Sequence, residues 1–410
     1  LCRGELEKAR GIRKNRGEEE KYTKMIFLCK IKQKFGLDRA VFLCYNTTVK
    51  SRTARTKLKK SARRSFIGKQ KGKSKMQTNK SIAVVGSGWR AFTWFNIINV
   101  MPGVTLKTVV CRNAEKAEQI KRMYPHARVV ADIEQIGSAD HVLLCVNKAS
   151  NVSIAESLLA RGYSVFCETP AGFTLSEREK LKQYIGKEFQ ITEQYPLRPR
   201  YIAIKKLVEK GYFGKVHTVE VSCCHSYHAA ALIRAFLQTQ KNLPEITKTV
   251  INDEYYESDG RNGKKTPELK EHQRVMALLD FGDRRAIYDF SHAQYFSLIR
   301  SERFAVKGTA GEIFCDKGYR LKDQSEIPFE LMPVYSGTDC SLHAPELDKI
   351  VCDGEVLFEN PFTGCRFSEE EIAMALWLKL ATELYDKGEA LYPACEGAID
   401  AALAAEIEDV

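Results

Sequence analysis

The feature that most constrains the fold of this chain is an apolar run that ends in a glycine-rich turn, SIAVVGSGWRA over residues 81–91. A continuous hydrophobic run is typical of a buried parallel strand, and apolar residues at helical spacing follow the turn. Gly86 allows the tight turn, Gly88 lets a pyrophosphate approach the backbone, and Ala91 lets the helix pack closely on the strand. The alternative is a plain tight turn without a nucleotide. The candidate phosphate-binding residues at the helix N-terminus are Gly86, Ser87, Gly88, Trp89 and Arg90.

Residues 80–195 alternate between strand and helix patterns. Repeated βα units predict a doubly wound parallel sheet with helices on both faces, which places the chain in the α/β class. Ligands of such sheets bind outside the carboxyl ends of the strands. The expected strands are 82–85, 104–111, 128–130, 141–146, 163–167 and 189–193, and the selected loops are 86–90, 112–113, 147–150, 168–170 and 194–195.

After residue 195 the pattern changes to a helix and then to strands that alternate apolar and polar residues. Alternating runs between residues 214 and 322 predict a largely antiparallel, half-buried open sheet. Residues 323–368 are polar, with Pro and Gly, and are expected to form loops and an insertion. The predicted domains are a basic extension at 1–75, a dinucleotide-binding Rossmann domain at 76–195, and a C-terminal α/β domain at 196–410 whose final helices lie within 369–410.

The positive charge is confined to the N-terminal segment. Residues 1–75 hold 24 Lys and Arg against 6 Asp and Glu, whereas the rest of the chain holds 40 against 46. Residues 76–410 therefore give no reason to expect nucleic acid as a partner.

The basic segment has two interpretations. One is an arm for nucleic acid or a transit peptide; the other is a disordered or non-native extension, since like-charged tracts without a core stay disordered. The first strand follows closely after Met76, and we favour Met76 as the start of the natural protein.

The chain has no apolar run long enough to span a membrane and no secretory signal, so no membrane partner is expected. Its 13 cysteines have no regular spacing, and Cys111, Cys145 and Cys167 fall in predicted buried strands. Reduced, buried thiols in a cytoplasmic protein explain this best.

The end of the second strand bears on the choice of cofactor. Sites that prefer NAD usually place an acidic residue there for the ribose hydroxyls, but this chain has Cys111-Arg112-Asn113. Arg112 can instead pair with a 2′-phosphate, which predicts NADP(H) as the preferred cofactor and NAD(H) as a possible one. The alternative is a solvated arginine in a loop.

The stretch GYSVFCETP at residues 162–170 resembles the glucose–fructose oxidoreductase / inositol dehydrogenase (Gfo/Idh/MocA) family, which carries Gly-Lys-x-Val-x-x-Glu-Lys-Pro there. The resemblance covers residues 80–410. It includes the strand that ends at Asn147, the Gly-x-x-Gly-Lys-Val motif at 211–216, and VKGTAG at 306–311. It implies hydride transfer between nicotinamide and a small sugar, polyol or related carbonyl substrate. It also implies a homo-oligomer, a dimer or tetramer, formed through the C-terminal sheet.

Two departures from the family pattern affect the chemistry. Thr169 stands where the family has the lysine that contacts nicotinamide ribose and substrate, beside Glu168. Cys224 replaces the aspartate of the family's Asp-x-x-x-His pair, whose histidine matches His228. A threonine hydroxyl can hydrogen-bond but cannot act as a cationic acid. His228 is thus the candidate proton donor for a reductive step, or else a helix cap.

The other candidates near the domain cleft are His225 and Tyr195. Either could assist proton transfer, and Tyr195 either contacts substrate or fills a gap as a strand-end aromatic. No metal is expected at Cys223-Cys224-His225, because adjacent strand residues point to opposite faces. Two functions stay open: an NAD(P)-dependent oxidoreductase acting on a small polar carbonyl, imine or sugar-like substrate, and a non-catalytic dinucleotide-binding sensor or scaffold.

Overall fold

The computed structural model describes residues 79–410, apart from 240–242, 261–262, 298, 338–344 and 409–410. The predictions for residues 1–75 and for Met76 as the natural start lie outside these residues.

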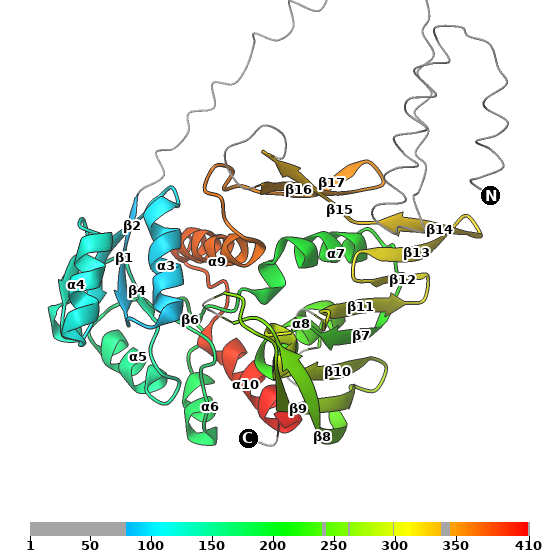
Figure 1. The fold of residues 1–410 in the computed structure, drawn as a ribbon, viewed down its shortest axis with the longest axis horizontal. Helices are drawn as coiled ribbons and strands as arrows, with labels where there is room; N and C mark the ends of the chain where they lie inside the picture. The colour runs from blue at the N-terminus through cyan, green and yellow to red at the C-terminus, as the bar shows by residue number, and fades with distance from the viewer. Residues whose placement is uncertain (1–78, 240–242, 261–262, 298, 338–344, 409–410) are drawn as a thin grey trace, which may run out of the picture. The chain divides into compact units, whose positions relative to one another are not determined.

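The first half of the described chain forms a parallel sheet with strand order β3-β2-β1-β4-β5-β6 (Figure 1). The strands are β1 Lys80–Val85, β2 Val104–Val110, β3 Arg128–Val130, β4 His141–Leu144, β5 Val165–Cys167 and β6 Phe189–Ile191. The connecting helices are α3 Trp89–Val100, α4 Ala114–Met123, α5 Asn151–Ala160 and α6 Leu175–Leu181. The doubly wound Rossmann sheet predicted from the βα pattern is confirmed. Its sixth strand ends two residues earlier than expected, so residues 192–194 belong to the following loop.

Both faces of the parallel sheet are buried, which is why β1 is a continuous apolar run. Ile82 and Val84 pack in a cluster with α3 and with α9 (Glu369–Asp386), while Ala83 and Val85 pack with α5. Helix α9 therefore covers one face of the N-terminal sheet, and the Trp377 ring meets that of Phe166 edge-on at 5.1 Å. Domain boundaries at 76–195 and 196–410 stay a prediction.

The second half is built on an eight-stranded sheet of order β14-β13-β12-β11-β7-β10-β9-β8. Neighbouring strands are antiparallel except β7 and β10, which confirms the largely antiparallel open sheet. The strands are β7 Val216–Ser222, β8 Glu245–Glu257, β9 Glu268–Asp280, β10 Arg285–Ser291, β11 Arg303–Gly308, β12 Gly311–Phe314, β13 Lys317–Lys322 and β14 Ser325–Glu330. The remaining helices are α7 Pro199–Glu209, α8 Ser226–Leu237 and α10 Ala394–Glu408, with 3₁₀ turns η2 Ile133–Gln135, η3 Tyr195–Leu197 and η4 His292–Tyr295.

The expectation that residues 323–368 form only loops is wrong. This stretch supplies β14 and a three-stranded sheet of β15 Met332–Ser336, β16 Glu346–Cys352 and β17 Glu355–Glu359. Pro328 and Pro333 suggested loops, but β14 and β15 are edge strands, where a missing N–H donor is tolerated.

Two further findings concern the whole described region. Within it, no helix is both long and apolar enough to cross a membrane. Nine cysteines lie within it. Cys111 and Cys167 are buried as expected, whereas Cys145 is only partly buried.

Candidate active site

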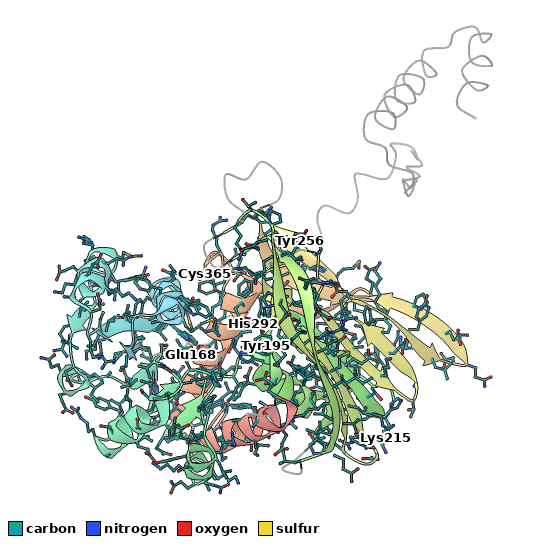
Figure 2. The ribbon with its side chains drawn as sticks, turned by 60° about the horizontal axis from the view of Figure 1, so that its bottom comes forward. Glu168, Tyr195, Lys215, Tyr256, His292 and Cys365 are labelled. Carbon is teal, nitrogen blue, oxygen red and sulfur yellow. The ribbon has the colours of Figure 1, made fainter. Side chains whose placement is uncertain are left out.

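A cavity of about 1440 Å³ lies at the carboxyl ends of the parallel strands and extends to α8 and η4. All five loops selected from the sequence line it. Figure 2 shows Glu168, Tyr195 and His292 close together where the parallel-sheet half meets the second sheet. Every residue predicted from the sequence to belong to the site lines this cavity: Gly86, Ser87, Gly88, Trp89, Arg90, Arg112, Asn147, Glu168, Thr169, Tyr195, His225 and His228.

The glycine-rich turn has the geometry of a phosphate-binding loop. Gly86 has φ +129°, and a Cβ there would lie 2.1 Å from the carbonyl oxygen of Cys145, so only glycine fits. A Cβ on Gly88 would meet no atom within 4 Å, so this backbone is open for close approach by a ligand. Gly88 is the N-cap of α3, whose first-turn N–H groups suit an anion. The residues present fit a dinucleotide pyrophosphate.

The loop after β2 carries positive charge on the cavity wall. Arg112 is exposed, and among the described residues no carboxylate pairs with it. The side chain of Asn113 caps α4 by accepting from the Lys116 N–H at 2.9 Å. The Lys116 ammonium donates to the carbonyl of Ser87 at 3.3 Å, which brings a second cation next to the glycine-rich turn.

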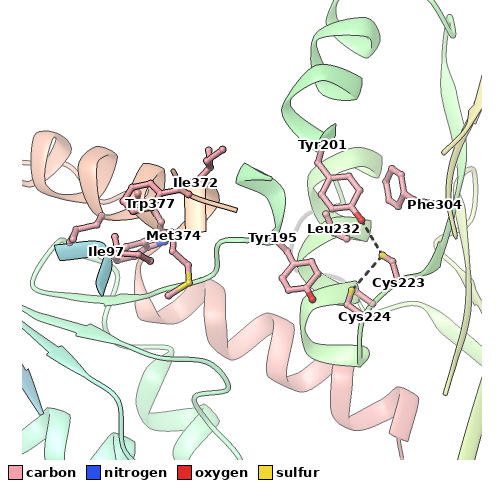
Figure 3. Packing of buried hydrophobic residues seen from close by; sticks show 14 of the residues in the cluster. Ile97, Tyr195, Tyr201, Cys223, Cys224, Leu232, Phe304, Ile372, Met374 and Trp377 are labelled. Carbon is pink, nitrogen blue, oxygen red and sulfur yellow. Dashed lines mark hydrogen bonds between the residues drawn. The ribbon is translucent and has the colours of Figure 1, made fainter. Parts of the chain in front are cut away.

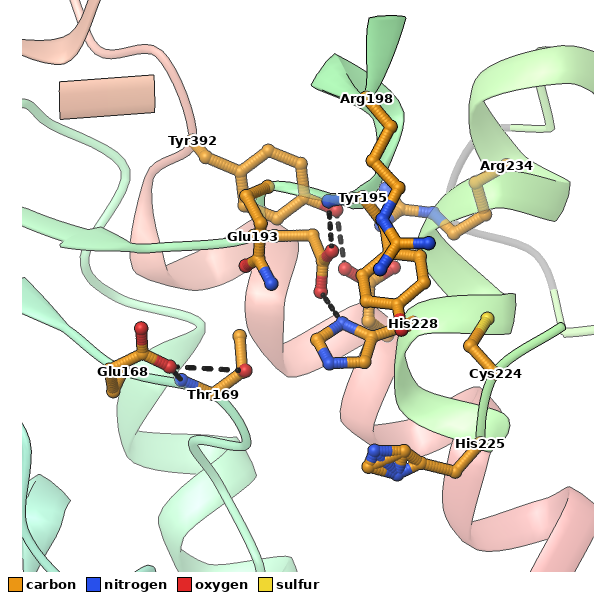
Figure 4. Close-up of polar contacts among 12 residues, drawn as sticks. Glu168, Thr169, Glu193, Tyr195, Arg198, Cys224, His225, His228, Arg234 and Tyr392 are labelled. Carbon is orange, nitrogen blue, oxygen red and sulfur yellow. Dashed lines mark hydrogen bonds and ion pairs between the residues drawn. The ribbon is translucent and has the colours of Figure 1, made fainter. Parts of the chain in front are cut away.

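Glu168 is held by hydrogen bonds at the end of β5. It accepts from the Trp94 indole N–H at 2.7 Å and from Arg90 Nε at 3.1 Å. Its other oxygen accepts from the backbone N–H of Thr169 at 3.1 Å (Figure 4). These contacts make Glu168 a structural anchor that links α3 to the loop carrying Thr169.

An ion network extends from Arg90 to the first turn of α9. Arg90 donates to Glu370 at 3.2 Å, and Arg198 donates to the other oxygen of Glu370 through Nε at 3.0 Å and Nη2 at 2.6 Å. The side-chain amide of Gln194 adds a hydrogen bond of 2.7 Å. Burial disfavours the charged form of Glu370, but the charges of Arg198 and Arg90 outweigh it and lower its pKa to about 2.

His228 lies in the first turn of α8 and faces a carboxyl group. Its Nδ1 is 2.7 Å from Oε2 of Glu193, and its ring stacks on that of Tyr195 with centroids 4.1 Å apart. Burial lowers the pKa of His228 to about 3, so the imidazole stays neutral near pH 7. His228 is therefore not a helix cap. The N-cap residue is His225, and its side chain makes no capping hydrogen bond.

Tyr195 joins the charged network to the histidine. It is buried rather than an exposed strand-end ring. The guanidinium of Arg198, which also binds Glu370, lies 4.3 Å from the centroid of the Tyr195 ring. The Tyr195 hydroxyl also interacts with that of Tyr295. Tyr295 accepts from the backbone N–H of His225 at 3.1 Å, and burial lowers the pKa of His225 to about 3.

The expected divergence of Cys223 and Cys224 is wrong. Their sulfur atoms lie 3.8 Å apart, and the Tyr201 hydroxyl lies 3.1 Å from Cys223 Sγ (Figure 3). The two cysteines follow the end of β7 in a bend, where strand alternation no longer applies. Among the described residues, no group of three or more His, Cys, Asp or Glu side chains could hold a metal ion.

Several residues that line the cavity or support its wall were missed by sequence reasoning. Glu193 precedes Tyr195 by two residues, and its place after a strand was a usable signal. Glu370 and Arg198 are 172 positions apart in the sequence, and no local sequence pattern predicts their contact. His292 and Tyr295 come from η4, between two strands of the second sheet. The alternation of apolar and polar residues there predicts strands but does not indicate which residues line the cavity.

The parallel sheet, its glycine-rich turn and the cavity at its strand ends form the arrangement typical of a Rossmann dinucleotide-binding domain. A model of the oxidoreductase family with an NAD-binding Rossmann fold (Gfo/Idh/MocA) matches residues 80–192. The resemblance inferred from the sequence is thereby confirmed for these residues.

A curated relative and two solved structures illustrate the similarity. The chain is 24% identical over 159 residues to scyllo-inositol 2-dehydrogenase (NADP+) IolW of Bacillus subtilis strain 168, a match that covers 37% of this chain and only 43% of that protein. An oxidoreductase from Agrobacterium radiobacter, solved with NAD+, L-tartaric acid and magnesium, superposes with TM-score 0.57 at 14% identity, covering 81% of this chain and 96% of that one. A myo-inositol dehydrogenase from Corynebacterium glutamicum ATCC 13032 superposes with TM-score 0.53 at 14% identity, covering 81% and 96%. At these identities the solved structures show the fold alone.

Proposed function

We propose that this protein is an NADP(H)-dependent oxidoreductase that transfers hydride between nicotinamide and a small polar carbonyl, imine or sugar-like substrate. The observation that carries the proposal is one continuous cavity. It joins the glycine-rich turn and Arg112 at one end to Tyr195, His225 and His228 at the other. A bound dinucleotide would extend from the first group towards the second, and the cofactor would supply the hydride.

The cofactor would be held by residues of three loops. The N–H groups at the start of α3 would bind the pyrophosphate, and Asn147 and Thr169 line the cavity beyond it. Thr169 has a hydroxyl where the resemblance places a lysine, so it can position a ligand but cannot supply a proton as a cation. That leaves proton transfer to His228.

The preference for NADP(H) rests on Arg112 and Lys116. Arg112 is exposed on the cavity wall, and the Lys116 ammonium lies against Ser87. Two cations beside the adenosine end of the site favour a 2′-phosphate through charge-assisted hydrogen bonds. The relative from Bacillus subtilis is named as NADP+-dependent, whereas the Agrobacterium radiobacter structure contains NAD+.

Cofactor binding tests the proposal directly. NADPH and NADH are titrated separately into the full chain while energy transfer from tryptophan to nicotinamide is followed. Trp89 lines the cavity with 56% of its surface exposed, so it is a suitable donor. We expect Arg112→Ala to weaken NADPH binding about tenfold, the loss of one charge-assisted hydrogen bond, and to leave NADH unchanged.

Arg122→Ala, in the last turn of α4, is the matched control. Tighter binding of NADH than of NADPH would overturn the proposed preference for NADP(H) but would leave the proposed oxidoreductase function standing. Binding of neither cofactor would overturn the function and return the sensor or scaffold to first place.

A first substrate probe follows from the relative's name. Oxidation of scyllo-inositol with NADP+, and reduction of the resulting ketone with NADPH, are followed by nicotinamide absorbance. The loss of the lysine at position 169 favours the reducing direction, because His228 can donate a proton from Nε2.

The second sheet is the proposed contact between copies of the chain in a homo-oligomer. One face of it carries Leu278 and Ile287, which are direct cross-strand partners, together with Phe314 and Tyr319. All four are exposed by 40–60%. Sedimentation of Ile287→Glu against the wild-type chain tests this surface. The cytoplasm stays the predicted location.

A further inference from the structure

The ring of His228 is fixed in one orientation. Besides the stack on Tyr195, its ring meets that of His225 at 5.1 Å and that of Tyr227 at 5.8 Å, both edge-on. Nδ1 is bound to Glu193, so Nε2 is the nitrogen left for a ligand. Figure 4 shows that nitrogen turned away from Glu193, on the side where Thr169 lies. The ring can therefore pass a proton between Glu193 and the cavity.

Glu193 is a buried carboxyl group without a cationic partner. Its side chain is 0% exposed, and among the described residues no Lys or Arg forms a salt bridge with it. Oε1 accepts from the backbone N–H of Tyr195 at 2.9 Å, and Oε2 faces His228. Burial raises the pKa of Glu193 well above its ordinary value. With Glu193 protonated, the pair would be electrically neutral, with one proton between Oε2 and Nδ1 and another on Nε2.

We propose that Glu193 holds a proton that reaches the substrate oxygen or nitrogen through His228, so that the pair performs the proton transfer for which the chain lacks a lysine. This inference rests on the proposed function. Glu193 acts through His228 and is a positioning residue, whereas His228 is the catalytic residue that touches the substrate.

In the reducing direction, two protons move in a relay. Hydride adds to the substrate carbon, and the π pair of its C=O or C=N bond moves to the heteroatom. That atom takes the proton from His228 Nε2 while Nδ1 takes the proton from Glu193. The products are an alcohol or amine, oxidised nicotinamide, a neutral imidazole protonated at Nδ1, and a Glu193 carboxylate. Without Glu193, the same donation would leave an imidazolate.

The resemblance places an aspartate four residues before the histidine, where this chain has Cys224. That side chain is buried, with its sulfur against Cys223. The carboxyl group that meets the imidazole comes instead from the loop after β6. A carboxyl–histidine pair therefore exists here although the local motif lacks its acid.

The location of the proton is measured without substrate. The infrared difference spectrum between the wild-type chain and Glu193→Gln at pH 7 is expected to contain one protonated carboxylic acid. Histidine ¹⁵N NMR, with His228 assigned by His228→Gln, is expected to give a neutral ring protonated at Nε2. A carboxylate at Glu193 with a cationic His228 would overturn the inference.

The relay is measured by turnover with NADPH and the ketone derived from scyllo-inositol. Glu193→Gln keeps a hydrogen bond to Nδ1 but holds no transferable proton, so kcat is expected to fall about 100-fold while NADPH binding is unchanged. Glu193→Asp should recover part of kcat. Glu179→Gln, at an exposed salt bridge on α6, is the matched control and should retain full activity. Retention of wild-type kcat by Glu193→Gln would mean that Glu193 only orients the ring.

A pH profile separates proton storage from a purely structural role. Wild-type kcat should fall as pH rises through the raised pKa of Glu193, and Glu193→Gln should lose that limb. The charged and titratable groups around the pair are Arg90, Glu168, Arg198, His225, Glu370 and Asp400. If the wild-type chain binds neither cofactor, the proposed function fails, whereas the infrared and NMR spectra still decide where the proton resides.

Discussion

Two buried carboxyl groups in the region of the cavity, Glu370 and Glu193, have pKa values shifted in opposite directions. Glu370 receives hydrogen bonds from Arg90 and Arg198, and its pKa falls to about 2. Glu193 meets only an imidazole and a backbone N–H, and its pKa rises well above the ordinary value. Burial acts against the charged form in both cases, so the guanidinium groups decide the sign.

The difference separates two tasks. The charged network of Arg90, Glu168, Arg198 and Glu370 links α3, β5 and α9 and fixes the cavity wall. The pair of Glu193 and His228, neutral in our proposal, would carry no fixed charge and could exchange protons. Groups that must stay charged are paired with arginine, and groups that must transfer a proton are buried without it.

The largest expected effect comes from removing an arginine of the charged network. Arg198→Met leaves Glu370 with only Arg90 as a cationic partner, and we expect a loss of about 3 kcal/mol in the free energy of unfolding. Urea denaturation at pH 7 measures it. Arg200→Met is the matched control, because its salt bridge to Asp316 is on the surface and should be worth less than about 1 kcal/mol. Equal losses in the two variants would contradict a special role for the network.

The two carboxyl groups should also leave opposite signatures in the pH dependence of stability. Glu193 has a raised pKa in the folded chain, so its contribution is full below its ordinary pKa of 4.5 and is lost as pH rises. The stability difference between the wild-type chain and Glu193→Gln should therefore grow as pH falls towards 4.5. This difference in the free energy of unfolding can increase by at most about 1.4 kcal/mol per pH unit. The lowered pKa of His228 acts in the opposite direction in this window, so the intact pair contributes little net slope.

Glu370 should behave in the reverse manner. Its folded pKa is lowered to about 2, so its contribution is full above pH 4.5 and is lost as pH falls towards 2. The difference between the wild-type chain and Glu370→Gln should be constant above pH 4.5 and shrink below it. Urea denaturation of the three proteins from pH 7 to pH 3 measures both effects. The same direction of change for both variants would show that the two carboxyl groups do not differ in charge state.

A smaller effect concerns the ring between the two regions. Tyr195→Leu removes the stack on His228 and the contact with Arg198, which together should be worth about 1–2 kcal/mol of unfolding free energy. Tyr195→Phe keeps both ring contacts and loses only the hydroxyl contact with Tyr295, so it should cost less. A double-mutant cycle with Arg198→Met measures the coupling. Equal losses of unfolding free energy in Tyr195→Phe and Tyr195→Leu would mean that the hydroxyl, and not the ring contacts, accounts for the stabilisation.

Much of the parallel half and of its ligand-binding edge could be predicted from the sequence, because strand runs and Gly86 are local signals. The rule that ligands bind at strand ends placed the right loops around the cavity before any contact was known. The residues that set the charge states could not be found this way. Glu370 meets Arg198 across 172 positions, and the raised pKa of Glu193 depends on burial that only tertiary packing creates.

The smallest expected effect tests whether the two regions influence each other. The negative charges of Glu168 and Glu370 add to burial in raising the pKa of Glu193. Glu370→Gln removes one of these charges and keeps the shape of the side chain, so it should lower the pKa of Glu193 while burial still holds it above the ordinary value. Infrared titration of the Glu193 carboxylic acid measures the shift, with Glu179→Gln as the control. An unchanged titration would mean that the arginines already cancel the effect of the Glu370 charge on Glu193. Burial alone would then raise the pKa of Glu193.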